Sequence, residues 1–568
     1  MTLGASLQIG RSGLLSSQAA MEVVGNNLAN MATRGYHRQE VSLTPAGSQQ
    51  VQQGVHLGRG VQVDAVTRQI NEALEGRLRS ALADESGSMV HQDMLAQIEA
   101  IENEFSDTDL SSRLSAFFDR WSNLAGNPTD PSLRDLVTDE AQALASDLQT
   151  MRSQFVQLRG QVDTSASGAA DQVNNLLKQV EDLNHRIATQ AHGAGGASSL
   201  RDQRDAALGE LAKYLDISTI EGESGMTDVF VGSLPIVLSG DSRGVELRDR
   251  VVDGRRVTDL VVAADGSRLD VSSGELGAML SFRRDDLGGA MDTLDSFAHQ
   301  LIWQVNRVHS QSQPGELPSE ITGAVRVDDP SASLGSEEAG LAFAAQHGSF
   351  QLHVTQMSTG QRTTRAIDVD LDGIDPASDT SLASLAAQID STPNVSANIT
   401  ADGRLDISGA SEDFRISFSD DTSGVLAALG VNTFFQGDSA VNVAVADTVA
   451  QNPQLVAAGQ GHQGGDNRGA LAIAALREKP VDELNGFSLS GYWSRHVEEY
   501  ASRLARSREQ VEADGAVRQN LESQQQSVSG VNADEETIDL MRHQRAYQAS
   551  ARFLSVVDEM MQTLLAAM

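Results

Sequence analysis

The sequence predicts a multidomain α+β protein with terminal coiled-coil helices and a long-helix bundle that carries two inserted β-rich outer domains. Three observations predict this class. Apolar residues recur at every seventh position near both ends of the 568-residue chain, long amphipathic stretches follow inward from each end, and two segments with alternating apolar and polar residues interrupt them. A chain of this length is expected to divide into several domains.

The first terminal helix is predicted over residues 4–30. Its apolar stripe consists of Leu7, Leu14, Met21 and Leu28, with Val24 on the adjoining seam. Asparagine favours helix ends over helix interiors, and Asn26, Asn27 and Asn30 crowd the last turn, followed by Gly35 and Tyr36. The pattern therefore indicates a helix end whose polar side chains bond elsewhere.

The last helix repeats the seven-residue pattern. Its row consists of Leu540, Tyr547, Leu554 and Met561, with Val557 and Leu564 beside them. Asn532 is predicted to be the N-cap, with Glu535 at the N3 position of a capping box. Burying such side chains contributes about 1.5 to 3 kcal/mol each, but an isolated helix of this length is marginal in water. Assembly with other subunits is favoured; pairing of the two helices within one chain is the alternative, and it would leave an apolar flank exposed.

The interior of the chain alternates between helical and strand-like sequence. Helices are predicted over residues 70–105, 110–124, 133–191, 199–214, 276–309, 466–476 and 489–521. The predicted domains are 1–50 with 527–568 (terminal coiled coil), 51–215 with 276–321 and 446–526 (helical bundle), 216–275 (small β domain) and 322–445 (outer β-rich domain). This nested order places both termini in one helical layer.

Composition excludes several classes of function. The net charge of −36 argues against nucleic-acid binding, and the absence of cysteine removes disulfides, thiolate metal sites and cysteine nucleophiles. None of the twelve histidines falls in a zinc-protease motif, and no hydrolase, phosphate-loop or dinucleotide motif occurs. We expect no enzyme activity, no cofactor and no metal. No segment has the roughly 20 apolar residues of a membrane span, and no signal peptide is predicted.

One acidic motif resembles the start of a calcium-binding loop. Asp368, Asp370 and Asp372 precede Gly373, and Asp379 stands near the position of the bidentate ligand. The preceding residues alternate like a strand, so a strand that ends in an Asp-rich turn is the preferred interpretation.

Both ends of the chain carry motifs of a known family. Residues 12–14 (SGL), 26–30 (NNLAN) and 33–36 (TRGY), together with residues 544–550 (QRAYQAS) near the C-terminus, resemble the signatures of the axial proteins of the bacterial flagellum. Residues 35–39 (GYHRQ), 200–205 (LRDQRD) and 461–470, which include GDN, resemble the hook-associated protein 1 family in particular.

The resemblance implies a structural subunit that forms a homo-oligomeric ring between the flagellar hook and filament. The implied partners are hook protein, hook-associated protein 3 and an export chaperone at the C-terminal helix. Export through the flagellar type III pathway, without a cleaved signal peptide, would place the chain outside the cell. The alternative is another axial or surface-filament protein whose outer β domain acts as an adhesin.

Overall fold

The computed structural model describes residues 3–33, 35–52, 55–103, 109–190, 197–252, 255–374, 378–461 and 465–567. The chain is a mixed helix and sheet protein with two compact units. Unit 1 comprises Met1–Met94, Gln161–Arg284 and Ala505–Met568, and unit 2 comprises Leu95–Gly160 and Asp285–Leu504. Helices α2 (Glu72–Glu102), α4 (Pro131–Gln190) and α12 (Leu489–Ser529) contribute residues to both units.

The remaining helices of unit 1 are α1 (Leu3–Asn30), α5 (Ser198–Tyr214), α6 (Gly274–Ser281) and α13 (Ala533–Ala567). Among them, α1 and α5 agree with the predicted ranges to within about two residues. Asn532 caps α13, because its Oδ1 accepts a hydrogen bond from the backbone N–H of Asp534 at 3.0 Å. The predicted N-cap is therefore confirmed, whereas the carboxylate of Glu535 bonds to Arg38.

Two hairpins extend the terminal segment of unit 1 beyond α1. Strand β1 (Gln39–Pro45) pairs antiparallel with β4 (Val61–Arg68), and β2 (Ser48–Gln52) pairs with β3 (Val55–Gly58). The predicted domain boundary after residue 50 falls within β2.

The other strands of unit 1 lie between α5 and α6 in the sequence. Strands β5 (Ile217–Glu221), β6 (Thr227–Val231), β7 (Leu234–Leu238) and β8 (Asp241–Ser242) form one antiparallel sheet, and β9 (Val245–Val252) pairs with β10 (Arg255–Val262). Asn174 of α4 holds the start of β9, since its side chain bonds to both the N–H and the C=O of Val245.

Unit 2 contains the remaining helices. They are α3 (Leu110–Gly126), α7 (Leu287–His309), α8 (Leu382–Asp390), α9 (Val425–Ala428), α10 (Asp447–Gln451) and α11 (Arg468–Ala475). Short helical turns lie at η2 (Glu337–Ala339), η3 (Pro453–Leu455) and η4 (Asp482–Leu484). The single helix predicted over 276–309 is interrupted by a π-helical turn, η1 (Phe282–Asp286). Buried apolar residues continue on both sides of this turn, at Met279 and Leu287, so the apolar pattern did not reveal it.

The strands of unit 2 are short. They are β11 (Gln313–Pro314), β12 (Glu320–Thr322), β13 (Gly348–Gln356), β14 (Arg362–Val369), β15 (Val395–Ile399), β16 (Leu405–Gly409), β17 (Phe414–Ser419), β18 (Phe435–Gln436), β19 (Ala444–Val445) and β20 (Ala457–Gly459). Two three-stranded sheets have the orders β12-β16-β15 and β14-β13-β17.

Helix α8 was absent from the predicted β-rich segment. Ser381 caps it through a reciprocal bond with Ser384. Its own residues Leu382, Leu385 and Ile389 are buried. An apolar run this short cannot be assigned to helix or strand by periodicity alone.

The Asp-rich motif confirms the prediction of a strand followed by a turn. Asp368 lies on β14 opposite Ser349, and Asp370 follows the strand directly. The structure brings possible ligand atoms of Asp370, Asp372 and Asp379 within 4.8 Å of one another. The flanking elements are β14 and α8, which differ from the helix pair of a calcium-binding EF-hand.

We expect this turn to bind calcium weakly or not at all. Two of its carboxylates already accept hydrogen bonds: Asp372 from the N–H of Ile374 at 2.9 Å, and Asp379 Oδ2 from the hydroxyl of Ser333, which lies outside the turn, at 3.0 Å. Calorimetric titration of the full chain with calcium should give no saturable heat. Tight binding that disappears in Asp370→Asn would contradict this interpretation.

Candidate assembly surface

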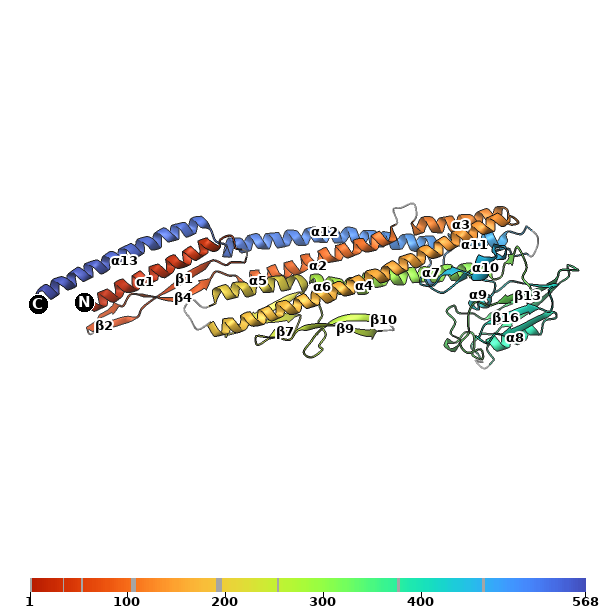
Figure 1. Ribbon diagram of the computed structural model, residues 1–568, viewed down its shortest axis with the longest axis horizontal. Helices are drawn as coiled ribbons and strands as arrows, with labels where there is room; N and C mark the ends of the chain where they lie inside the picture. The colour runs from red at the N-terminus through yellow and green to blue at the C-terminus, as the bar shows by residue number, and fades with distance from the viewer. Residues whose placement is uncertain are drawn as a thin grey trace. The chain divides into compact units, whose positions relative to one another are not determined.

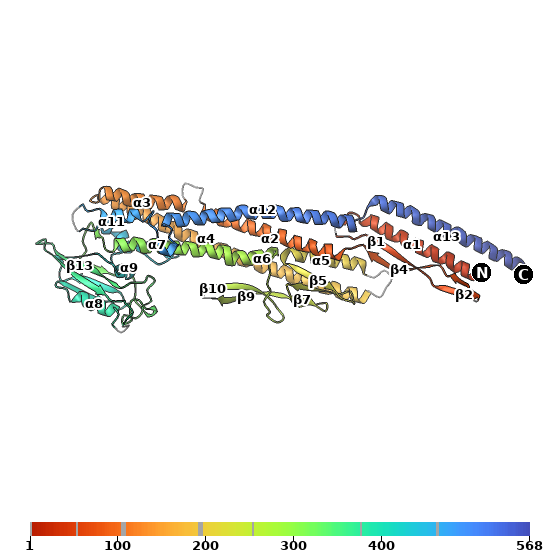
Figure 2. The same cartoon turned by 180° about the vertical axis from the view of Figure 1, so that it is seen from behind.

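The two terminal helices of the chain lie side by side (Figures 1 and 2). They are antiparallel. Gly10 and Gly13, in the first half of α1, lie against Leu554 and Ser550 in the second half of α13, whereas Asn27 near the end of α1 bonds to Glu536 near the start of α13. The pairing alternative considered from the sequence is thus present within one chain.

Two glycines allow this close approach. A Cβ atom added at Gly10 would lie 2.8 Å from Leu554 Cδ2, and one added at Gly13 would lie 2.8 Å from Ser550 Oγ. The neighbouring Ser12 bonds to the first strand residue of β4, since its Oγ accepts from the N–H of Val61 at 3.2 Å. The SGL motif therefore combines a close helix contact with an anchor for the β1–β4 hairpin.

The helix pair leaves most predicted interface residues half-buried in the single chain. Leu7, Leu14, Met21, Leu28, Asn30, Tyr36, Leu540, Tyr547, Leu554 and Met561 are of this kind, Val24, Asn27 and Val557 are buried, and Asn26, Gly35 and Leu564 are exposed. Much of the seven-residue row of each helix is thus already partly covered by other residues of the same chain.

A second apolar row on α13 remains exposed beside the paired face. It consists of Ile538, Met541, Phe553, Val556, Met560 and Leu564. A shallow groove of about 480 Å³ is lined by the last three of these together with Glu559, Thr563 and Ala567. Of this row, only Leu564 is among the predicted interface residues, although the spacing of residues 553, 556, 560 and 564 is typical of one face of a helix.

The asparagine motif at the end of α1 connects both ends of the chain. Asn27 Nδ2 donates to the backbone oxygen of Gln39 at 2.9 Å and to Glu536 Oε2 at 3.0 Å. Its Oδ1 accepts from the Tyr36 hydroxyl at 2.8 Å and from the Gln39 N–H at 3.1 Å. One buried amide therefore fixes the turn after α1 and holds the start of α13.

The arginine of the GYHRQ motif strengthens this connection. Arg38 Nε donates to Glu536 Oε1 at 2.6 Å, and its terminal nitrogens lie 3.3 Å from Glu535 and 3.4 Å from Asp539. Glu536 is only 1% exposed, so its charge depends on this guanidinium and on Asn27. Arg34 of the neighbouring TRGY motif (residues 33–36) lies outside the described residues.

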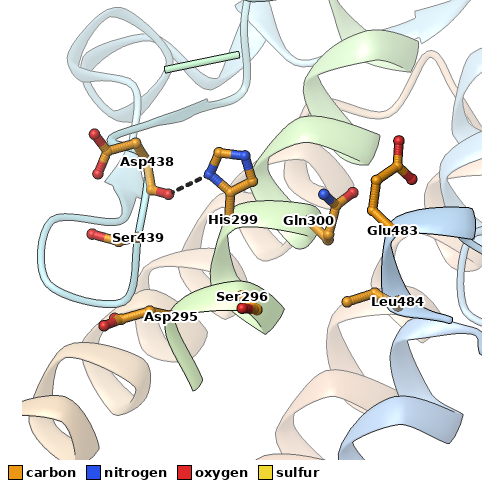
Figure 3. Close-up of a pocket in the computed structure, with 8 residues that line it drawn as sticks. All are labelled: Asp295, Ser296, His299, Gln300, Asp438, Ser439, Glu483 and Leu484. Carbon is orange, nitrogen blue, oxygen red and sulfur yellow. Dashed lines mark hydrogen bonds between the residues drawn. The ribbon is translucent and has the colours of Figure 1, made fainter. Parts of the chain in front are cut away.

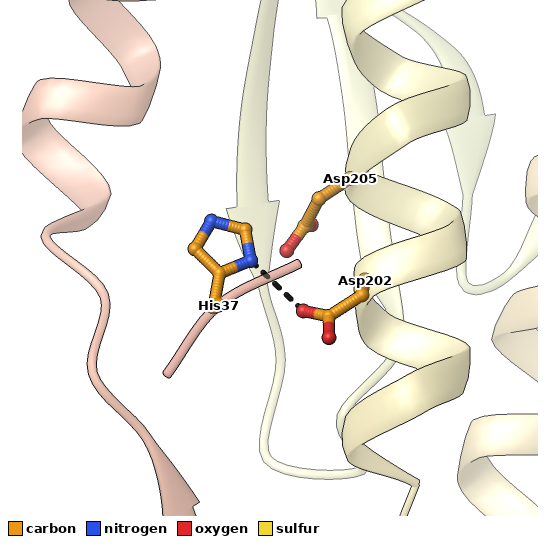
Figure 4. A group of neighbouring side chains, drawn as sticks. All are labelled: His37, Asp202 and Asp205. Atoms are coloured by element: carbon orange, nitrogen blue, oxygen red, sulfur yellow. Dashed lines mark hydrogen bonds and ion pairs between the residues drawn. The ribbon is translucent and has the colours of Figure 1, made fainter. Parts of the chain in front are cut away.

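His37 joins the same turn to α5 (Figure 4). Its Nδ1 lies 2.8 Å from Asp202 Oδ1, and its Nε2 lies 3.5 Å from Glu75 Oε1. Burial lowers the pKa of His37, but the bonds to Asp202 and Glu75 outweigh burial and raise the pKa to about 9. His37 is therefore a cation at neutral pH.

The group of His37, Asp202 and Asp205 has the spacing of a possible metal site. Arg68 already occupies the space between the two carboxylates, with its Nη1 2.7 Å from Asp202 Oδ1 and 2.7 Å from Asp205 Oδ2. Two cationic side chains thus neutralise both acids, and this arrangement favours a structural ion-pair network over a metal ligand set.

We expect His37 to make the stability of unit 1 pH-dependent. Its pKa is raised in the folded chain above the unfolded value near 6.5, so its contribution is complete below about pH 6.5 and is lost as the pH rises through about 9. The loss is on the order of 3 kcal/mol. Unfolding of the full chain should show this slope between those pH values, and His37→Gln should lack it. Identical slopes for both proteins would contradict the assignment.

The LRDQRD motif is explained by its contacts within unit 1. Asp202 and Asp205 hold His37 and Arg68, whereas Arg204 is buried and bonds to Asn184 Oδ1, Gly225 O and Glu221 Oε2. These contacts join α5 to α4 and to the first sheet.

The GDN motif of unit 2 has a local structural role. Asp466 accepts hydrogen bonds from the backbone of Gln460 and Gly461 and from Arg468, and Asn467 donates to Ala125 O at 2.8 Å. Burial opposes ionisation of Asp466, but these bonds hold its pKa well below the usual range. Residues 462–464 lie outside the described residues.

A polar pocket of about 320 Å³ lies in unit 2 (Figure 3). It is lined by Asp295, Ser296, His299, Gln300, Asp438, Ser439, Glu483 and Leu484. His299 Nδ1 bonds to the backbone oxygen of Asp438 at 2.8 Å, and its ring stacks on Phe343. The Nδ1 atom of His299 is therefore already used in a hydrogen bond that stabilises the fold.

Among the described residues, no helix is both long and apolar enough to cross a membrane.

Three family models match the chain. The model described as "Flagellar hook-associated protein FlgK helical domain" matches residues 95–316, "Flagellar basal body rod FlgEFG protein C-terminal" matches 523–567, and "Flagella basal body rod protein" matches 7–37. The last two matches fall on α13 and α1, the helices that form the candidate surface.

Three relatives match this chain over about half or nearly all of its length. Flagellar hook-associated protein 1 of Salmonella typhimurium is 26% identical over 565 residues, which cover 98% of each chain. The protein of that name from Escherichia coli is 23% identical over 575 residues and also covers 98% of each chain. That of Bacillus subtilis is 27% identical over 279 residues, or 48% of this chain and 55% of the relative.

A solved structure supports the fold. The flagellar hook junction protein FlgK from Burkholderia pseudomallei superposes with a TM-score of 0.50 at 18% identity, and the match covers 80% of this chain and 100% of that one. The family is structural and has no enzyme activity. The helical-domain model and the end-to-end relatives show that this chain is similar along its length to flagellar hook-associated protein 1, and the solved structure shows a similar fold.

Proposed function

We propose that this chain is a structural subunit of the bacterial flagellum that forms the junction between hook and filament. The observation that carries the proposal is the exposed apolar row of α13 beside its paired face. Large contiguous apolar surfaces on a folded chain mark interaction sites. The proposed occupant is a terminal helix of a neighbouring subunit, in a contact between two different surfaces.

The terminal helices supply the main subunit contacts in this proposal. The α1–α13 pair forms a coiled coil around a central channel, and the predicted rows, including Leu7, Leu14, Leu540 and Leu554, exclude water when neighbours cover the half-buried seams. Hook protein and hook-associated protein 3 bind on either side of a homo-oligomeric ring. The helical bundle provides lateral contacts, and the segments 216–275 and 322–445 are the outer β-rich domains.

The same surface would guide the chain before assembly. We propose that the chain leaves the cell through the flagellar type III pathway without a cleaved signal peptide, and that an export chaperone covers the apolar row of α13 on the way. An apolar helix face that stays uncovered is an aggregation hazard, and a chaperone on this face would lower that hazard before assembly.

Removal of either terminal helix tests the proposal. Deleting residues 1–30 or residues 535–568 should leave a soluble fragment that cannot restore filament growth in cells lacking the full chain. Deletion of the β-rich residues 322–445 is the matched control, because the terminal helices remain intact. If a chain without α1 or α13 still supported filament growth, the proposal would be wrong.

A further inference from the structure

A cleft of about 290 Å³ lies within unit 1, beside the His37–Asp202 network. It is bordered by α2, α5 and the first sheet, and three arginines line it: Arg68, Arg79 and Arg204. Hydroxyl groups of Ser80 and Ser218 line the same cleft. The space therefore contains several hydrogen-bond donors.

Nearby carboxylates are already neutralised by other cations or donors. Asp205 lies 2.7 Å from Arg68, and Glu221 lies 2.7 Å from Arg204 and 3.2 Å from Arg201. Glu75 accepts from Gln525 at 2.6 Å and lies 3.5 Å from His37. These pairings leave Arg79 as the cation of the cleft that lacks a close acid.

Arg79 has only one neutral partner in the part of the chain that the structure describes. Its Nη2 donates to Thr219 Oγ1 at 2.9 Å, whereas its Nε is buried without a hydrogen-bond partner. Burial lowers the pKa of Arg79, and the more distant charges of Asp205 and Glu75 only partly offset this effect. Arg204, which is 2% exposed, also keeps a buried Nε without a partner.

Arg79 is half-buried, its Nε lacks a hydrogen-bond partner, and no carboxylate of the described residues lies within ion-pair distance of it. A guanidinium in this state can accept an acidic group from outside the described chain. We propose that the Arg79 cleft binds a carboxylate, with Arg79 as its main ligand and the Ser218 hydroxyl as a further donor. The planar fork of a guanidinium matches the two oxygens of a carboxylate. A singly charged group fits better than a phosphate dianion, because Glu72, Glu75, Asp205 and Glu221 also line the cleft.

Two sources could supply this carboxylate: a small free acid or an Asp or Glu side chain of a second copy of the chain. Each copy carries 78 acidic residues. The binding test below uses the free chain, so its outcome does not depend on the proposed assembly at the junction.

Fluorine NMR with trifluoroacetate, at constant ionic strength kept with sodium chloride, measures binding to the full chain. We expect saturable broadening with the wild type, and binding at least about tenfold weaker in Arg79→Gln. Arg79→Lys keeps the buried charge, which protects folding, but loses the fork and should also bind more weakly. Arg77→Gln is the control, because Arg77 is an exposed arginine of the same helix.

Equal broadening in wild type and Arg79→Gln, or tighter binding of inorganic phosphate than of trifluoroacetate, would overturn the proposal. Measuring the assembly of the chain onto isolated hooks distinguishes the two possible sources of the carboxylate. If a second copy supplies it, Arg79→Gln weakens assembly and acetate inhibits the wild type. If a free acid supplies it, assembly is unchanged while trifluoroacetate binding is lost.

Discussion

Replacing Val556 and Met560 together by aspartate should abolish assembly and leave the free chain folded. The two side chains are 54% and 55% exposed, so they contribute little to the stability of the single chain. Covering them in an assembly would contribute about 1.5 to 3 kcal/mol each, and two buried aspartates would add a desolvation cost. A loss of more than about a hundredfold in affinity follows.

Sedimentation with isolated hooks measures this loss, and circular dichroism on heating checks the fold. Ser555→Asp is the matched control, because Ser555 is an exposed residue adjacent to Val556 that points away from the apolar row. If the double variant assembled like the control, the exposed row of α13 would have no role in assembly.

Glu536→Gln should loosen the pair of terminal helices within one chain. The variant replaces the charged partner of Arg38 Nε at 2.6 Å by a neutral amide in a buried position. Charge-assisted hydrogen bonds of this kind contribute about 1.5 to 3 kcal/mol. Hydrogen exchange in α1 and α13 should therefore speed up by roughly tenfold to a hundredfold.

Glu535→Gln provides the comparison for this experiment. Its carboxylate also lies near Arg38, at 3.3 Å, but the side chain is 59% exposed. Exposed ion pairs contribute about 0 to 1 kcal/mol, so exchange should change little. Equal effects of the two substitutions would show that the buried position of Glu536 has no special importance.

The sequence predicted the existence of elements better than their contacts. Seven-residue rows predicted α1 and α13, because periodicity reports which face of a helix is apolar. The same rows could not show that the two helices pair antiparallel in one chain. That arrangement depends on Gly10 and Gly13, where the absence of a side chain permits the close approach of α13 to α1. A heptad pattern consists of apolar residues and does not include these glycines.

The sequence motifs include Asn27 and Arg38 of the hydrogen-bond network that also contains Glu536, but only the structure shows which of these residues bond to one another. Asn27 and Glu536 are separated by 509 positions, so no local pattern connects them. Likewise, LRDQRD supported the family resemblance, but its bonds to His37 and Arg68 require the fold. The sequence did signal that polar side chains after α1 bond elsewhere, and Asn27 does so.

The exposed row of α13 was largely missed for a physical reason. A helix of this length can present two apolar stripes, and the predicted interface residues follow the stripe with strict seven-residue spacing. The structure shows that this stripe is partly used within the chain, which leaves the second row, centred on Val556 and Met560, for partners.

Electron microscopy of flagella from cells with and without this chain tests the central claim most directly. A junction subunit is required before filament can grow, so cells without the chain should carry hooks that lack filaments, and restoring the full chain should restore filaments. Normal filaments on hooks that lack the chain would contradict the account.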